Sequence, residues 1–145
     1  MKTKIILGLA VLLVVIQFFR IDKDVPTYAP EDDFLEVSGA NQQISNLVKS
    51  SCYDCHSFET QYPWYSNVAP VSWWVKDHVN HARKHLNFSI WATYTEKRKN
   101  HKLKETIEEL EEEEMPLGSY TWMHSEARLT NEQRKQLIDW VRSIR

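Results

Sequence analysis

Residues 51–57 read Ser51-Cys52-Tyr53-Asp54-Cys55-His56-Ser57, and this stretch decides what kind of fold the chain must build. Cys52 and Cys55 are the only cysteines among 145 residues, and His56 directly follows the second. Two thiols at this spacing, with a histidine beside them, suit covalent attachment of haem. Each thiol can form a thioether with one vinyl group, while the imidazole binds the iron. The motif therefore predicts one haem c, held by Cys52 and Cys55, with His56 as the proximal iron ligand.

Three other uses of the motif remain open from the sequence. A disulfide between Cys52 and Cys55 would close a very small loop with poor geometry, and it needs no histidine. A thioredoxin-like redox pair requires a βαβ context, which this chain lacks. A structural zinc site normally takes two pairs of ligands, and there is no second cysteine pair. A zinc site would use Cys52, Cys55 and His56 but needs a further ligand, so haem attachment is the preferred interpretation.

The N-terminus has the pattern of a membrane or export segment. Lys2 and Lys4 precede an apolar run from Ile5 to Phe19 that only Gln17 interrupts. As a helix this run is about 22 Å long, against about 30 Å for the hydrocarbon core, which suits a signal peptide or a short anchor. No small-residue cleavage site follows, so we expect an uncleaved membrane helix over residues 1–21. The positive-inside rule then predicts that the rest of the chain lies on the periplasmic side.

The rest of the chain divides into a linker and one helical domain. Residues 22–38 combine two prolines and several acids without a helical or strand period, so they are predicted to be a linker. Within it, Phe34, Leu35 and Val37 are expected to pack on the domain. Residues 39–145 are predicted to form the c-type haem-binding domain.

Helical periodicity dominates that domain. It predicts helices over 40–51, 71–86 and 93–114, and a last helix that begins with a capping box of Thr130 and Gln133. Residues 57–69 are predicted to be a loop. No alternating strand pattern occurs, and the chain has only 3 glycines and 5 prolines. We therefore expect an all-α, cytochrome c-like small helical domain preceded by one N-terminal membrane helix. The net charge of −2 disfavours nucleic acid as a partner.

The sixth ligand of the iron is the harder assignment. Cytochromes of this general type use Met or His there. Met115 is the preferred candidate because it lies in a loop beside Pro116, well after the haem motif. Met123 and His78 are the alternatives, and a site without a distal protein ligand is a further one. Trp64 and Trp73 are expected to wall the haem.

The other histidines carry weaker signals. His78, His81 and His85 share one side of the predicted helix, where His78 belongs to the apolar stripe and its neighbours are expected to be exposed. His101 and His124 are expected at the surface.

The chain also resembles the bacterial haem-binding domain family, a group of small c-type-cytochrome-like modules. The resemblance covers about residues 45–143 and departs from the usual pattern at Ala82, where a glycine is common. It implies a helical haem protein that is membrane-anchored or periplasmic. The residues that carry it are Ser51 to Ser57, Thr60, Tyr62 to Tyr65, Pro70 to Trp73, His78, Leu86 to Ser89, Trp91, Met115 to Leu117, Tyr120, Met123, His124, Ala127, Leu129 and Trp140.

These observations favour electron transfer between membrane or periplasmic redox partners. A haem enzyme with an open, peroxidase-like distal site and a haem-based sensor are the alternatives. Peroxide chemistry would require a distal histidine together with an arginine, and only Arg83 and Arg98 are candidates for that arginine.

Overall fold

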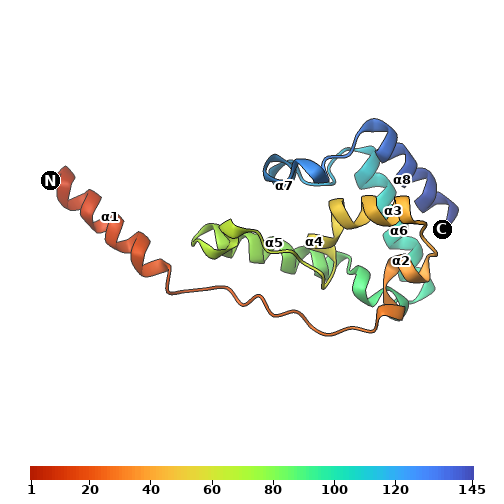
Figure 1. The fold of residues 1–145 in the computed structure, drawn as a ribbon, viewed down its shortest axis with the longest axis horizontal. Coiled ribbons are helices and arrows are strands. Elements are labelled where there is room, and N and C mark those ends of the chain that lie inside the picture. The colour runs from red at the N-terminus through yellow and green to blue at the C-terminus, as the bar shows by residue number, and fades with distance from the viewer.

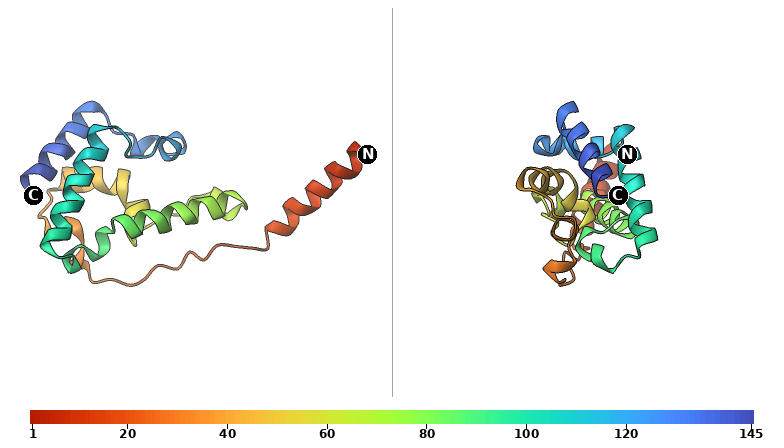
Figure 2. Two further views of the ribbon diagram at one scale, coloured as in Figure 1. Left: turned by 180° about the vertical axis from the view of Figure 1, so that it is seen from behind. Right: turned by 90° about the vertical axis from the view of Figure 1, so that its right-hand side faces the viewer.

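The computed structural model describes all 145 residues and contains helices but no strand, which confirms the all-α class. Helices α5 and α7 project from one end of a body formed by the other domain helices, and α1 lies beyond that same end (Figure 1; Figure 2, left). The α-helices are α1 (Lys2–Ile16), α2 (Phe34–Val37), α3 (Gln42–Val48), α4 (Asp54–His56), α5 (Val71–His85), α6 (Glu96–Glu111), α7 (Gly118–Met123) and α8 (Asn131–Ser143). The 3-10 turns are η1 (Pro30–Asp32), η3 (Trp64–Asn67), η4 (Phe88–Thr93) and η5 (Ser125–Ala127), and η2 (Lys49–Tyr53) is a π-helical turn.

The haem motif lies at the end of an uninterrupted helical run. Asn41 caps α3 by accepting a hydrogen bond from the Ile44 amide at 3.0 Å. The run continues through η2 into α4, so it extends five residues beyond the predicted end at residue 51. Cys52 lies within η2, and π-helical turns of this kind often occur at functional sites.

The later helices follow the predicted pattern. Helix α5 spans Val71–His85 and confirms the helix predicted over 71–86. Helix α6 begins after its Thr95 cap and ends at Glu111, a few residues before Pro116. In α8 the capping box is formed: the hydroxyl of Thr130 accepts from the Gln133 amide, and the Gln133 side chain accepts from the Thr130 amide. The predicted loop over 57–69 contains only the short turn η3.

The hydrophobic core lies at the end of the body opposite α1 (Figure 1). Helix α2 contributes Phe34, whose ring stacks on Phe88 with centroids 4.9 Å apart and meets Trp91 edge-on at 4.7 Å. Phe34 and Leu35 therefore pack on the domain as expected, whereas Val37 is exposed. The core residues are Phe34, Leu35, Ile44, Val48, Tyr53, Phe88, Trp91, Tyr94, Leu103, Ile107, Leu110, Leu129, Leu137, Ile138 and Val141.

We expect Phe34→Ala to lower the free energy of unfolding by about 3–5 kcal/mol, because it removes a buried ring from three aromatic contacts. Val37→Ala on the same short helix removes exposed surface only and should change it by about 0.5 kcal/mol or less. Urea denaturation followed by circular dichroism measures both. Equal effects of the two substitutions would contradict the placement of α2 in the core.

The expected membrane helix needs a correction. Helix α1 does form inside residues 1–21, and none of its side chains is buried. However, neither α1 nor any other helix has the length and apolarity needed to cross a bilayer. The reason is that α1 ends at Ile16, so its 15 residues extend only about 22 Å at 1.5 Å per residue.

Candidate functional site

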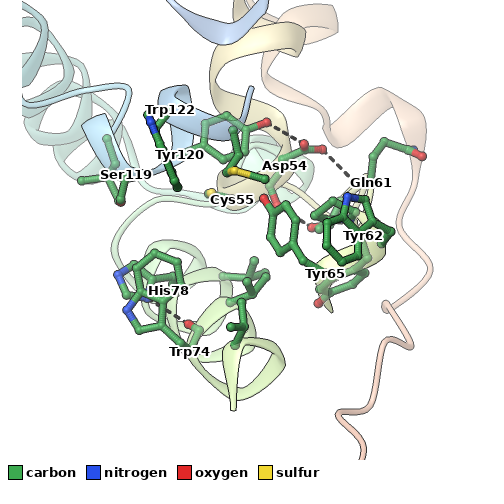
Figure 3. Close-up of a pocket in the computed structure, with 18 of the residues that line it drawn as sticks. Asp54, Cys55, Gln61, Tyr62, Tyr65, Trp74, His78, Ser119, Tyr120 and Trp122 are labelled. Atoms are coloured by element: carbon green, nitrogen blue, oxygen red, sulfur yellow. Dashed lines mark hydrogen bonds between the residues drawn. The ribbon is translucent and has the colours of Figure 1, made fainter. Parts of the chain in front are cut away.

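A cavity of about 650 Å³ lies beside the haem motif, in the size range of small-molecule and cofactor sites. Three segments surround it: the turn from α4 to η3, one face of α5, and the segment 117–123 that includes α7 (Figure 3). Twelve of its nineteen lining residues are hydrophobic, so the cavity suits a large apolar ligand. The lining residues are Asp54, Cys55, Thr60, Gln61, Tyr62, Pro63, Trp64, Tyr65, Val71, Trp74, Val75, His78, Val79, Leu117, Gly118, Ser119, Tyr120, Trp122 and Met123.

Asp54 ties the haem motif to the other walls of the cavity. Its carboxylate accepts hydrogen bonds from the Tyr120 hydroxyl at 2.7 Å and from the Gln61 amide at 2.8 Å (Figure 3). Its backbone carbonyl accepts from the Thr60 hydroxyl at 2.6 Å. Asp54 thus connects α4 to α7 and to the following loop, which holds Cys55 at the cavity wall.

The two thiols form no disulfide, and the pKa of each is raised above its ordinary value. Burial raises the pKa of Cys52 to about 12. Burial, with a smaller effect of the Asp54 charge, raises the pKa of Cys55 to about 11. Redox-active cysteines are nucleophilic because their pKa is depressed, so this environment does not favour a thioredoxin-like pair.

His56 is held in the tautomer that binds a metal. Its Nδ1 lies 3.1 Å from the carbonyl oxygen of Leu86, and a carbonyl can only accept, so Nδ1 carries the proton. The lone pair is then on Nε2, as in most metal-ligating histidines. Burial lowers the pKa of His56, which favours the neutral imidazole, the form in which a histidine can bind a metal.

Of the three residues assigned to the haem, only one lines the cavity itself. Cys55 does so, whereas Cys52 packs against the hydrophobic core and the ring of His56 lies beside Phe88, with centroids 6.0 Å apart. All three still belong to one continuous helical run. No group of three or more His, Cys, Asp or Glu side chains is placed to hold a metal ion, so the zinc alternative has no ligand set here.

One polar group at the cavity wall has no hydrogen-bond partner. The hydroxyl of Tyr62, one of the lining residues, is buried without a hydrogen-bond partner. The ammonium groups of Lys23 and Lys76 lie 5.4 and 5.9 Å from the centroid of its ring. The two ammonium groups thus lie over the Tyr62 ring, and neither lysine is among the residues that line the cavity.

The apolar stripe of α5 faces the cavity and includes His78. The ring of His78 lies against Trp74 with centroids 4.2 Å apart, and its Nδ1 is 2.9 Å from the Trp74 carbonyl oxygen. His81 and His85 are exposed, as expected for neighbours outside the stripe.

The two candidate methionines are separated by the fold. Met123, at the end of α7, lines the cavity, and Met115 does not. Met115 instead lies in the turn after α6, where its carbonyl oxygen accepts a hydrogen bond from Arg134 at 2.7 Å.

The two candidate tryptophans are also separated. Trp64 lines the cavity, whereas the indole of Trp73 donates to the backbone of Phe19 at 2.8 Å. Trp74 takes the place expected for Trp73. The sequence contained that signal, because Trp74 and not Trp73 shares the stripe of Val71 and His78.

Sequence reasoning missed the tyrosines around the cavity. Tyr65 and Tyr120 line it, and no helical period marks Tyr65 because it lies in a loop. The Tyr65 hydroxyl lies 2.7 Å from Nε2 of His124, whose Nδ1 is 3.1 Å from Glu126. His124 was expected at the surface, but only 15% of its side chain is exposed, since it stacks on Tyr120 and bonds Tyr65.

Comparison with known proteins gives one match. The family model of the haem-binding domain matches residues 11–143, which include the haem motif and every residue that lines the cavity. No curated protein and no solved structure matches the chain.

Proposed function

The chain belongs to the haem-binding domain family, and from this premise we propose that it is a c-type haem protein that carries single electrons outside the cytoplasm. One observation carries the proposal: the Cys-x-x-Cys-His turn places Cys55 on the wall of a large apolar cavity. A haem iron supplies one-electron chemistry by cycling between the ferric and ferrous states.

Cys52 and Cys55 attach the group in this proposal. Each thiol would hold the group through one thioether bond to a vinyl substituent. The hydrogen bond from His56 to the Leu86 carbonyl orients the imidazole and leaves Nε2 for the iron.

We assign the sixth position to Met123, with His78 as the alternative and Met115 as the earlier sequence-based candidate. The position of Met123 at the cavity supports this assignment, as does its uncommitted thioether. His78 is engaged by Trp74 through both its ring and Nδ1. Met115 lies outside the cavity lining, although a methionine beside a proline is the more familiar pattern.

The surroundings of the cavity favour electron transfer over peroxide chemistry. Arg83 donates to the Ser57 carbonyl and to Thr60, and Arg98 lies over the Tyr94 ring, so neither arginine lines the cavity. The walls of the cavity are mostly apolar, and the hydrogen bonds of Asp54 link two of them.

The proposal is tested by the optical spectrum of the purified, reduced protein with and without carbon monoxide. We expect the spectrum of a six-coordinate, low-spin haem that carbon monoxide does not change, because both axial positions are filled. Rapid binding of carbon monoxide would contradict electron transfer as the function and support an open distal site.

In this proposal the N-terminal segment determines the location of the protein in the cell. We assign residues 1–21 to export and to attachment at the outer face of the membrane, with redox proteins of that compartment as partners. Two lysines in the first turn of α1, followed by an apolar stretch without a buried side chain, support this assignment.

A further inference from the structure

The end of α1 is bound to the domain at one place. The side-chain amide of Gln17 pairs with the backbone of Ala69 in both directions, donating at 3.0 Å and accepting at 2.9 Å. Trp73 donates to the carbonyl of Phe19, and Lys23 donates to Asn67 at 2.7 Å. Residues 17–23 therefore have a fixed position against residues 67–73.

The segment they contact is apolar and exposed. We call residues 64–74 the aromatic tip; it comprises η3 and the first turn of α5, at the end of the domain nearest α1 (Figure 1). Its large side chains are uncovered, with 74% of Trp64 in solvent. A patch of this kind on a small domain marks an interaction surface. The exposed members are Trp64, Val68, Val71, Trp73 and Trp74.

Helix α1 indicates what covers the tip. Its large apolar side chains are exposed except that of Ile16, which is half-buried, and the exposed Phe18 and Phe19 continue that surface up to the contact with Trp73. Burial of such apolar surface away from water is favourable. If α1 enters a bilayer, the hydrogen bonds from Gln17 and Trp73 bring the aromatic tip to the lipid with it.

We propose that the aromatic tip is a membrane-binding surface, which inserts into the interfacial layer of a phospholipid bilayer beside α1. This rests on the membrane attachment in the proposed function and extends it from the N-terminal segment to the haem domain itself.

The charges around the tip match that position. Arg20, Lys23 and Lys76 lie next to it, and lysine and arginine side chains extend toward headgroups while their stems remain in apolar surroundings. Tryptophan is enriched at the same depth of a bilayer. Trp64, Val71 and Trp74 belong to both the tip and the cavity wall, so the cavity lies directly beside the lipid.

The test uses the full-length protein labelled with fluorotryptophan and added to vesicles of phosphatidylcholine and phosphatidylglycerol. Fluorine NMR spectra are recorded with and without a nitroxide-labelled phosphatidylcholine in the vesicles. Any broadening by the haem is the same in both spectra, so the difference between them reports contact with the lipid alone. Single Trp→Phe variants assign the six signals. We expect the signals of Trp64, Trp73 and Trp74 to broaden several-fold more than that of Trp140, which packs on the core at the opposite end.

Gln17→Leu tests the link to α1. It removes both hydrogen bonds to Ala69 but leaves α1 apolar, so the protein should still sediment with vesicles while the broadening of Trp64 and Trp73 falls. Gln43→Leu is the matched control, because Gln43 bonds only Gln136, on α8. It should leave the spectra unchanged.

The outcomes distinguish the membrane-binding aromatic tip from membrane attachment in general. Sedimentation with vesicles, without excess broadening at the tip, would overturn the membrane-binding tip alone. Failure to sediment would overturn membrane attachment as well. The haem absorption of the same sample reports on the cofactor independently of both.

Discussion

The double substitution Cys52→Ala and Cys55→Ala is expected to abolish covalently bound haem completely. These are the only thiols in the chain, and each is assigned one thioether, so no residue is left to form a stable link. Haem staining of the protein on a denaturing gel measures the effect, because non-covalent haem is lost under those conditions.

Matched controls separate attachment from folding. Ser50 lies in the same helical run, and its hydroxyl forms hydrogen bonds only with the Leu47 carbonyl and the Ser51 hydroxyl. The Ser50→Ala variant should therefore retain full staining. Circular dichroism of the double variant checks that the helices persist. Staining of the double variant at the wild-type level would rule out attachment through this motif.

The second large effect is expected from Met123→Ala. The haem should stay attached through Cys52 and Cys55, but the iron should lose its thioether ligand and bind carbon monoxide. Because a methionine ligand favours ferrous iron, the reduction potential should fall by on the order of 0.1–0.3 V, within the range of about 0.8 V that axial ligands span. The sulfur-to-iron band of the ferric protein in the near-infrared reports the bond directly.

Met115→Ala is the matched control for this prediction. It changes a methionine whose side chain does not line the cavity, so the band and the potential should remain as in the wild type. The reverse result, with the band lost in Met115→Ala and kept in Met123→Ala, would restore the assignment made from sequence. A wild-type protein without the band would favour His78 or an open site.

The sequence by itself determined most of the helical elements and predicted the chemistry of the Cys-x-x-Cys-His motif. Helices α5, α6 and α8 were predictable because amphipathic periods and the Thr130–Gln133 cap are local, and local interactions depend on neighbours along the chain. The spacing of Cys52, Cys55 and His56 is local as well, so the motif can be identified without knowledge of the tertiary structure. The predicted membrane-spanning helix failed for a simple physical reason: a helix that ends at Ile16 is too short.

Only the tertiary structure decided which distant residues share the cavity. Met115 and Met123 both lie well after the motif in the sequence. No local pattern indicates which of the two methionines the fold brings close to the motif. The hydrogen bond from Tyr120 to Asp54, across 66 positions of sequence, brings α7 and Met123 to the cavity. The bond from Arg134 to the Met115 carbonyl holds Met115 near α8 instead. In the same way, the bonds of Gln17 and Trp73 join the N-terminal helix to the aromatic tip. Such long-range contacts depend on how packed helices meet in space, which the order of residues along the chain does not reveal.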